Sequence, residues 1–247
     1  MNTQITMDHL AKLKLDGMLK AYQAVLSLSV QNQPSINQFM ARLAEAEIQD
    51  KAAKKTALFL RQSKLRYDAI LEQVHCSPQR NLTQEKLMMI ADCTFIERAE
   101  NLLITGSTGV GKSHLACAIG RQACTLGYRT LYFGINRFLE EISLTKLDGT
   151  YIKLLNKIEK AYLIIIDDFG LHPLDGTTRR ALLQILEDRY GLKSTIIVSQ
   201  LPVEKWYEYI GESTISDYPN FIIMQSNTTV CVVNHQLSCS NSANYFA

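Results

Sequence analysis

The chain has 247 residues, of which 47% are hydrophobic and 20% charged, and its formal net charge is +2. This length fits one or two domains, and the composition is typical of a globular protein in water. No apolar run reaches the ~20 residues that cross a bilayer, and the first residues lack the pattern of a secretory signal. The six cysteines form no C-x-x-C pair, which argues against a metal site or a disulfide framework. We therefore expect a cytoplasmic protein with reduced thiols and no membrane partner.

Residues 1–80 are predicted to form a small helical domain. Apolar residues recur at helical spacing from Leu10 to Leu26, and Gln31–Ser35 breaks this pattern. A second helix is predicted through Phe39 and onward toward Leu71. The region therefore consists of helices that precede the main fold.

The second helix carries six cations that are candidates for DNA binding: Lys51, Lys54, Lys55, Arg61, Lys64 and Arg66. Cations of this kind neutralise the phosphates of duplex DNA. Placed at 100° per residue, they spread widely around the helix and form no single stripe, so a solvated helix face remains the alternative. The net charge permits nucleic-acid binding without arguing for it, because local patches matter more than the total.

A glycine-rich loop lies between a strand predicted at Asn101–Thr105 and a helix that begins near His114. The loop fits the pattern G-x-x-x-x-G-K-[S/T] at every fixed position, with the sequence Gly106-Ser107-Thr108-Gly109-Val110-Gly111-Lys112-Ser113. Its glycines let successive backbone N–H groups point inward, where the positive end of the helix dipole adds to them. We predict that residues Gly106 to His114 bind a nucleotide, that Lys112 reaches its β- and γ-phosphates, and that Ser113 helps to hold Mg²⁺.

Strands and helices alternate around this loop, which predicts an α/β fold with a parallel sheet. The predicted elements are a helix opened by Thr83, a strand at Arg129–Phe133, helices at 137–142 and 151–158, a strand at Tyr162–Ile166, a helix at 177–190 and a strand at Thr195–Ser199. The run Tyr162–Ile166 is apolar without alternation, as expected of a parallel strand that is buried on both faces.

Two carboxylates end that apolar strand. Asp167 stands where a carboxylate would hold Mg²⁺ together with the Ser113 hydroxyl, and Asp168 stands where an acid polarises the attacking water. Two carboxylates at a strand end can also simply cap the next turn. With the phosphate-binding loop present, we interpret the pair as a Walker B site.

A polar sensor of the γ-phosphate is expected on a further strand. In ATPases with a second acidic residue at this place, another strand lies between the loop strand and the Walker B strand. Thr195–Ser199 has the right place in the sequence, so Ser199 and Gln200 are both candidates for the sensor. A polar cap on a buried strand is the alternative, and the sequence does not choose between the two residues.

Four blocks of this chain resemble the IstB group of AAA+ ATPases. They are residues 101–113, 167–171, 186–191 and 199–206, all in register. Members of that group are transposition helpers encoded beside the transposase of two-gene insertion sequences, and they are relatives of the helicase loader DnaC. The resemblance runs from the N-terminal helices to about Asp217.

The resemblance implies a P-loop NTPase fold of the AAA+ type, with ATP as the nucleotide. It implies a protein that assembles as a homo-oligomer on duplex DNA, hydrolyses ATP and delivers target DNA to the transposase encoded by the same element. It also implies that the N-terminal helices contribute to DNA binding. The expected domains are therefore 1–80 for DNA binding and assembly, 81–217 for ATP binding, and 218–247 as a divergent tail.

The tail departs from the family pattern. Residues 218–247 contain no Asp, Glu, Lys or Arg, and they lack the helix that supplies an arginine to a neighbour's ATP. We interpret the tail as out-of-frame translation after Asp217; the alternative is a genuine divergent tail with a strand at Thr229–Val233. ATP turnover would then be impaired, and the candidates to replace the arginine are Arg179, Arg180 and Arg189, although a solvated or structural role is favoured for each.

Two other functions stay open. A DnaC-like helicase loader is less favoured, because the Asp-Asp-Phe-Gly and Ser-Gln-Leu-Pro blocks resemble the transposition helpers. A nucleotide-binding DNA adaptor or inactive remnant without useful turnover is favoured by the charge-free tail.

Overall fold

The computed structural model describes residues 3–171, 173–210 and 228–232. The chain divides into two compact units, Met1–Phe59 and Leu60–Ala247. This division comes earlier than residue 80, because Ala69 and Leu82 are fully buried in the core of the second unit. The functional division into domains stays a prediction.

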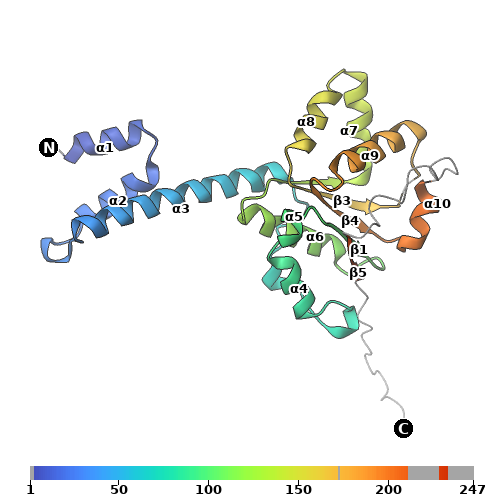
Figure 1. Ribbon diagram of the computed structural model, residues 1–247, viewed down its shortest axis with the longest axis horizontal. Coiled ribbons are helices and arrows are strands. Elements are labelled where there is room, and N and C mark those ends of the chain that lie inside the picture. The colour runs from blue at the N-terminus through green and yellow to red at the C-terminus, as the bar shows by residue number, and fades with distance from the viewer. Residues whose placement is uncertain (1–2, 172, 211–227, 233–247) are drawn as a thin grey trace, which may run out of the picture. The chain divides into compact units, whose positions relative to one another are not determined.

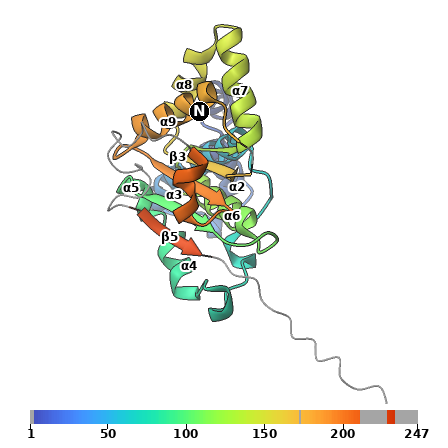
Figure 2. The ribbon, with the colours of Figure 1, turned by 90° about the vertical axis from the view of Figure 1, so that its right-hand side faces the viewer.

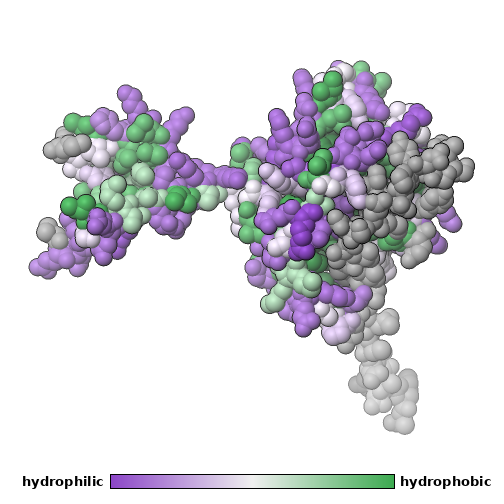
Figure 3. All heavy atoms as spheres, viewed as in Figure 1, coloured by the Kyte–Doolittle hydropathy of each residue, from purple (hydrophilic) through white to green (hydrophobic). Residues whose placement is uncertain are grey.

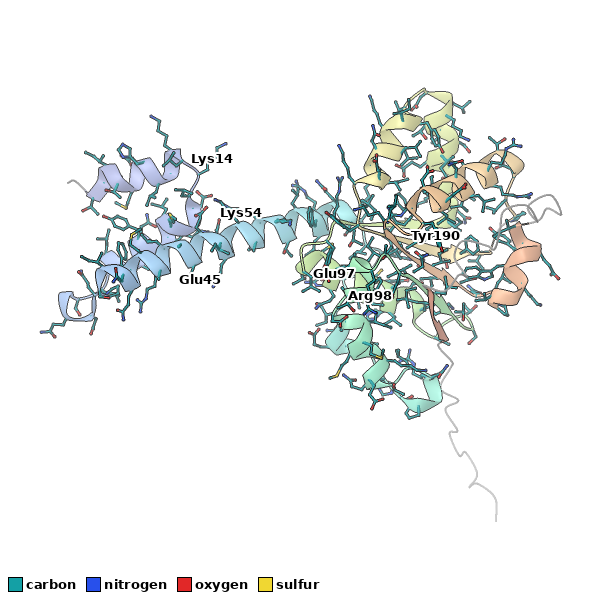
Figure 4. The ribbon with its side chains drawn as sticks, viewed as in Figure 1. Lys14, Glu45, Lys54, Glu97, Arg98 and Tyr190 are labelled. Carbon is teal, nitrogen blue, oxygen red and sulfur yellow. The ribbon has the colours of Figure 1, made fainter. Side chains whose placement is uncertain are left out.

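The first unit consists of α1 (Thr3–Lys12), α2 (Asp16–Leu26), a 3₁₀ turn at Val30–Asn32 and the first part of α3 (Ile36–Ser63). The single helix expected from Leu10 to Leu26 is two helices, because Lys14 between them (labelled in Figure 4) adopts a left-handed conformation, with φ 57°. Gly17 lets α2 approach α3, since a Cβ there would overlap the backbone of Ala46 and Glu47. The Glu47 carboxylate also accepts a hydrogen bond from Met18 N at 3.1 Å.

The second unit is built on a five-stranded sheet. Its strands are β1 (Asn101–Thr105), β2 (Thr130–Gly134), β3 (Leu163–Phe169), β4 (Ser194–Ser199) and β5 (Thr228–Val232), in the order β2-β3-β4-β1-β5. Each neighbouring pair is parallel. The predicted α/β fold with a parallel sheet is confirmed, and β4 lies between β1 and β3 as the sensor argument expects.

Helices cover both faces of the sheet (Figures 1 and 2). They are α4 (Gln84–Ala91), α5 (Thr94–Glu97), α6 (Lys112–Thr125), α7 (Ile135–Leu147), α8 (Tyr151–Glu159), α9 (Gly176–Arg189) and α10 (Trp206–Ile210), with 3₁₀ turns at Leu71–Gln73, Pro78–Arg80 and Val203–Lys205. Successive residues of β3 point to opposite faces, so Ile164 and Ile166 pack with α7–α10 while Leu163 and Ile165 pack with α4–α6. For this reason β3 is apolar without alternation.

The strand expected in the tail is present one residue earlier, as β5. It pairs with β1, with Asn101 opposite Thr228 and Thr105 opposite Val232. The rest of the tail lies outside the described residues. The frameshift hypothesis stays a prediction, because a paired strand here is compatible with either origin of the tail.

In the described part of the chain, no helix has both the length and the apolar character that a membrane span requires. Hydrophilic side chains spread over the visible face of each unit (Figure 3).

Candidate functional site

The glycine-rich loop connects the carboxyl end of β1 to the first turn of α6. Gly109 and Gly111 have φ of 80° and 86°, a region that glycine adopts without strain. Gly111 caps α6, which begins at Lys112. A Cβ at Gly109 would meet no atom within 4 Å, so this side of the loop is open. The backbone thus forms a cradle at a helix N-terminus, the arrangement that binds phosphate.

Lys112 is buried inside this cradle with 6% of its surface exposed. Its Nζ donates to the Ser107 carbonyl at 2.7 Å. Burial lowers the pKa of the amine, and the charges of Asp167 and Asp168 oppose that effect. The lysine is therefore held within the loop, beside the two carboxylates that balance its charge.

Asp167 is fully buried at the end of β3 and is held by three hydrogen bonds. The hydroxyls of Ser113 and Tyr132 donate to its two carboxylate oxygens at 3.1 and 2.5 Å, and Asp168 N donates at 2.9 Å. A serine hydroxyl beside one carboxylate suits Mg²⁺, which commonly takes one or two carboxylates together with substrate phosphates. The residues present therefore fit the metal that the sequence predicts.

Tyr132 is a site residue that the sequence analysis missed. Burial raises the pKa of its hydroxyl, and the hydrogen bond to Asp167 acts in the same direction. The hydroxyl thus stays protonated and donates to the carboxylate. The residue reaches Asp167 because β2 pairs with β3, a neighbour relation that the sequence of β2 does not contain.

Asp168 lies one residue further along the strand and is partly open to solvent. It adopts φ 60°, and its carboxylate pairs with Arg66 Nη1 at 3.2 Å. Arg66 was expected among the DNA-binding cations of a helix, but it follows the end of α3 and contacts the nucleotide site. The helix predicted to continue toward Leu71 ends at Ser63, and the Arg66 side chain lies beside Asp168.

Gln200 is the sensor candidate whose side chain contacts the loop. Its Oε1 accepts a hydrogen bond from Thr108 Oγ1 at 2.6 Å. The Ser199 hydroxyl is buried, donates to the Phe169 carbonyl at 2.7 Å and accepts from Leu201 N at 3.0 Å. Ser199 is therefore engaged in holding the ends of β3 and β4 together.

These groups surround one cavity of about 320 Å³. It is lined by the loop, the two carboxylates, Gln200 and Arg66, together with Tyr67 and His114, whose rings lie 6.3 Å apart. Cationic side chains and backbone amides that bind phosphates, together with carboxylates that bind a metal, suit a nucleoside triphosphate with its metal. His114, expected among the nucleotide-binding residues, lines the same space.

A second residue missed by the sequence analysis supports the loop from outside. Arg80 Nη2 donates to the Val110 carbonyl at 2.6 Å, and its Nη1 donates to the His75 carbonyl at 2.5 Å. The segment between α3 and α4 is thereby connected to the phosphate-binding loop.

The other candidate DNA-binding cations lie in different environments. Lys51 pairs with Glu47 at 3.3 Å, and Lys54 pairs with Asp16 and, at 2.7 Å, with Asp50 (Lys54 is labelled in Figure 4). Lys55 lies 5.4 Å from the centre of the Phe59 ring. The remaining two candidates, Arg61 and Lys64, are exposed. Ion pairs within the first unit thus engage Lys51 and Lys54.

The three arginines considered as substitutes for the missing one differ in burial. Arg189 is 3% exposed and donates to backbone carbonyls, so its role is structural. Arg179 Nη2 donates to the Leu174 carbonyl at 3.0 Å. Arg180 is exposed. The structural role favoured for Arg189 is the one that the contacts show.

Comparison with known proteins gives one family. A family model described as IstB-like ATP binding protein matches residues 8–220, and this match ends close to Asp217. Two insertion sequence ATP-binding proteins from Sinorhizobium fredii are 40% and 34% identical over 86% of this chain and 86% of their own length. The corresponding protein of an insertion sequence from Pseudomonas fluorescens is 36% identical over 82% of this chain and 88% of its own.

Solved structures of the same fold include two replication proteins. A DnaC helicase loader has a TM-score of 0.56 and 23% identity, covering 69% of this chain and 99% of that one. AMPPCP-bound DnaA from Aquifex aeolicus has a TM-score of 0.56 and 21% identity, covering 68% of this chain and 51% of that one. At these identities, the similarity shows the fold alone: the AAA+ type of P-loop NTPase.

Proposed function

The chain belongs to the family of IstB-like ATP binding proteins, and from that premise we propose that it binds ATP with Mg²⁺ and hydrolyses it. The observation that carries the proposal is the arrangement around Asp167. The Ser113 and Tyr132 hydroxyls hold this carboxylate beside the phosphate-binding loop, with Asp168 next to it. Phosphoryl transfer depends mainly on such positioning and on charge neutralisation.

Each residue then has a separate task. Lys112 and the loop amides bind the β- and γ-phosphates. Ser113 and Asp167 would hold the metal, which would supply positive charge beside the phosphate oxygens. Asp168 orients and polarises the attacking water. Gln200 contacts the loop through Thr108 and reads the presence of the γ-phosphate. The adenine contacts are left unassigned.

We further propose that the protein is a helper of DNA transposition in the cytoplasm. In this function it assembles as a homo-oligomer on duplex DNA and delivers target DNA to a transposase encoded by the same element. The relatives at 34–40% identity support this proposal, because each is named as the ATP-binding protein of an insertion sequence. Residues 1–80 would contribute to DNA contact. The exposed candidates, apart from Lys51 and Lys54 with their ion pairs, are Lys55, Arg61 and Lys64.

There are two alternatives, and the turnover experiment below distinguishes the second of them from the proposal. The helicase loader is supported by a shared fold at 23% identity, which is weaker than the support from the insertion-sequence relatives. The adaptor without turnover is supported by the charge-free residues 218–247, where the family's arginine is missing.

The test is ATP turnover by the purified chain with and without duplex DNA, using Lys112→Ala as the blank. Removing the buried amine takes away the main positive group of the loop, so turnover is expected to disappear in this variant. Turnover that duplex DNA stimulates supports the helper ATPase. If ATP binds but turnover stays at the level of the blank, the adaptor hypothesis replaces the ATPase.

A further inference from the structure

The segment that follows α3 is packed onto the helix of the phosphate-binding loop. Ala69 is fully buried against Cys117 and Ala118 of α6, and Leu65 packs against the same cluster. Asp68 forms an ion pair with Arg121, one helical turn further along α6. The backbone of residues 65–69 therefore has a defined position relative to the loop.

Arg66 lies within this packed segment and extends toward the nucleotide cavity. Its guanidinium pairs with Asp168 at 3.2 Å, and the residue lines the cavity together with Lys112 and Ser113. The Tyr132 hydroxyl beside it raises the pKa of the guanidinium. Arg66 is the only arginine among the described residues that line this cavity.

The ion pair between Arg66 and Asp168 is weakly held. The side chains are 50% and 34% exposed, and ion pairs with this exposure contribute little because water competes for both partners. A terminal phosphate carries more negative charge than one carboxylate and offers oxygens that match both arms of a guanidinium. Arg66 would therefore exchange Asp168 for the phosphate, which leaves the carboxylate free to orient water.

We propose that Arg66 supplies, from within the same chain, the guanidinium that neutralises the γ-phosphate of ATP. This inference rests on the proposed ATP site. It assigns a charge donor to a site for which residues 218–247 offer no arginine. It also gives a reason for the position of Arg66, which lies beyond the end of α3 and beside Asp168.

The test compares Arg66→Ala, Arg66→Lys and the control Arg98→Ala in the full chain without DNA, so that a role in DNA contact has no effect. Arg98 is also an exposed arginine paired with a carboxylate, that of Glu100 at 3.6 Å, and its replacement gives the same change in charge. ATP and ADP affinities are measured by calorimetry, and turnover by phosphate release. Thermal unfolding of each variant verifies that it is folded.

For Arg66→Ala we expect ATP affinity to fall about tenfold with ADP affinity unchanged, which corresponds to one charged hydrogen bond to the third phosphate. Turnover should fall about 100-fold or more, because arginines at a transferring phosphate contribute on the order of 10³–10⁵. Arg66→Lys should recover part of both losses, and Arg98→Ala should change neither.

The inference is overturned if Arg66→Ala leaves the ratio of the ADP to the ATP dissociation constant unchanged. This happens if neither affinity changes or if both fall equally, and an equal fall indicates a structural role for Arg66. A rise in turnover in Arg66→Ala also overturns it, because Arg66 would then only restrain Asp168. If the parent chain has no turnover, the proposed ATPase fails, while the ratio of the two dissociation constants still decides the role of Arg66.

Discussion

Replacing Arg189 by leucine should destabilise the second unit without removing the nucleotide site. The guanidinium at the end of α9 donates to the carbonyls of Ile158, Ala161 and Ser194 at 2.9, 3.0 and 2.7 Å. These carbonyls lie at the end of α8, in the turn before β3 and at the start of β4. Burial lowers the pKa of the guanidinium to about 10, so it remains charged at neutral pH.

The magnitude follows from the carbonyls that lose the guanidinium as their donor. The Ile158 carbonyl keeps the Ala161 N–H at 3.0 Å, so two acceptors lose the donor that the guanidinium supplied. Each buried acceptor left without a partner costs about 1–3 kcal/mol, and leucine restores part of the apolar contact, so we expect a loss of roughly 2–4 kcal/mol. With an m-value of roughly 2–3 kcal/mol per molar urea, the unfolding midpoint should shift down by about 1–2 M. Circular dichroism during urea titration measures this shift.

Arg180→Leu is the matched control, because Arg180 lies on the same helix but is exposed. Its midpoint should stay within about 0.3 M of the parent, as expected for a surface substitution. ATP turnover per folded molecule should be unchanged in Arg189→Leu. A midpoint equal to that of the parent, or turnover lost from a fully folded variant, would refute the structural assignment.

Three further outcomes test the nucleotide site and the first unit. Gln200→Ala should lower turnover at least about tenfold with little change in stability. Ser199→Ala should instead cost about 1–3 kcal/mol in urea unfolding, because the buried Phe169 carbonyl and the part-buried Leu201 N–H lose their partner; the reverse pattern would exchange the two roles. Tyr132→Phe removes the donor at 2.5 Å from Asp167 and should raise the Mg²⁺ concentration for half-maximal turnover about tenfold, the effect of one charge-assisted bond; an unchanged Mg²⁺ titration contradicts this. Hydrogen bonds from neighbouring lysines lower the pKa of Asp50 below its ordinary value of 3.8. The stability that the charged carboxylate contributes is therefore complete above pH 3.8 and is lost as the pH falls through the lowered pKa. Asp50→Asn should weaken the acid dependence of thermal unfolding below about pH 4, and an identical dependence would exclude the contribution.

The N-terminal cations show where sequence reasoning ended. A charge pattern identifies lysines and arginines but does not identify their partners. Lys54 lies between Asp16 and Asp50 because α2 packs on α3 through Gly17, and that contact joins residues almost forty positions apart. DNA binding by this region therefore stays a prediction from the family.

The phosphate-binding loop and the α/β fold were determined by the sequence alone. A glycine-rich turn, a lysine at a helix start and apolar strands are local patterns, since each depends on residues close together in the chain. Such patterns are sufficient to place Gly106–Ser113 and the paired acids Asp167 and Asp168 at the ends of strands.

The tertiary structure alone decided which side chains meet these groups. Tyr132 reaches Asp167 because β2 pairs with β3, and Gln200 contacts the loop because β4 lies beside β1. Arg66 pairs with Asp168, 102 positions away, because the segment after α3 packs on α6. Such contacts follow from strand order and from packing between distant segments, which no local pattern of residues contains.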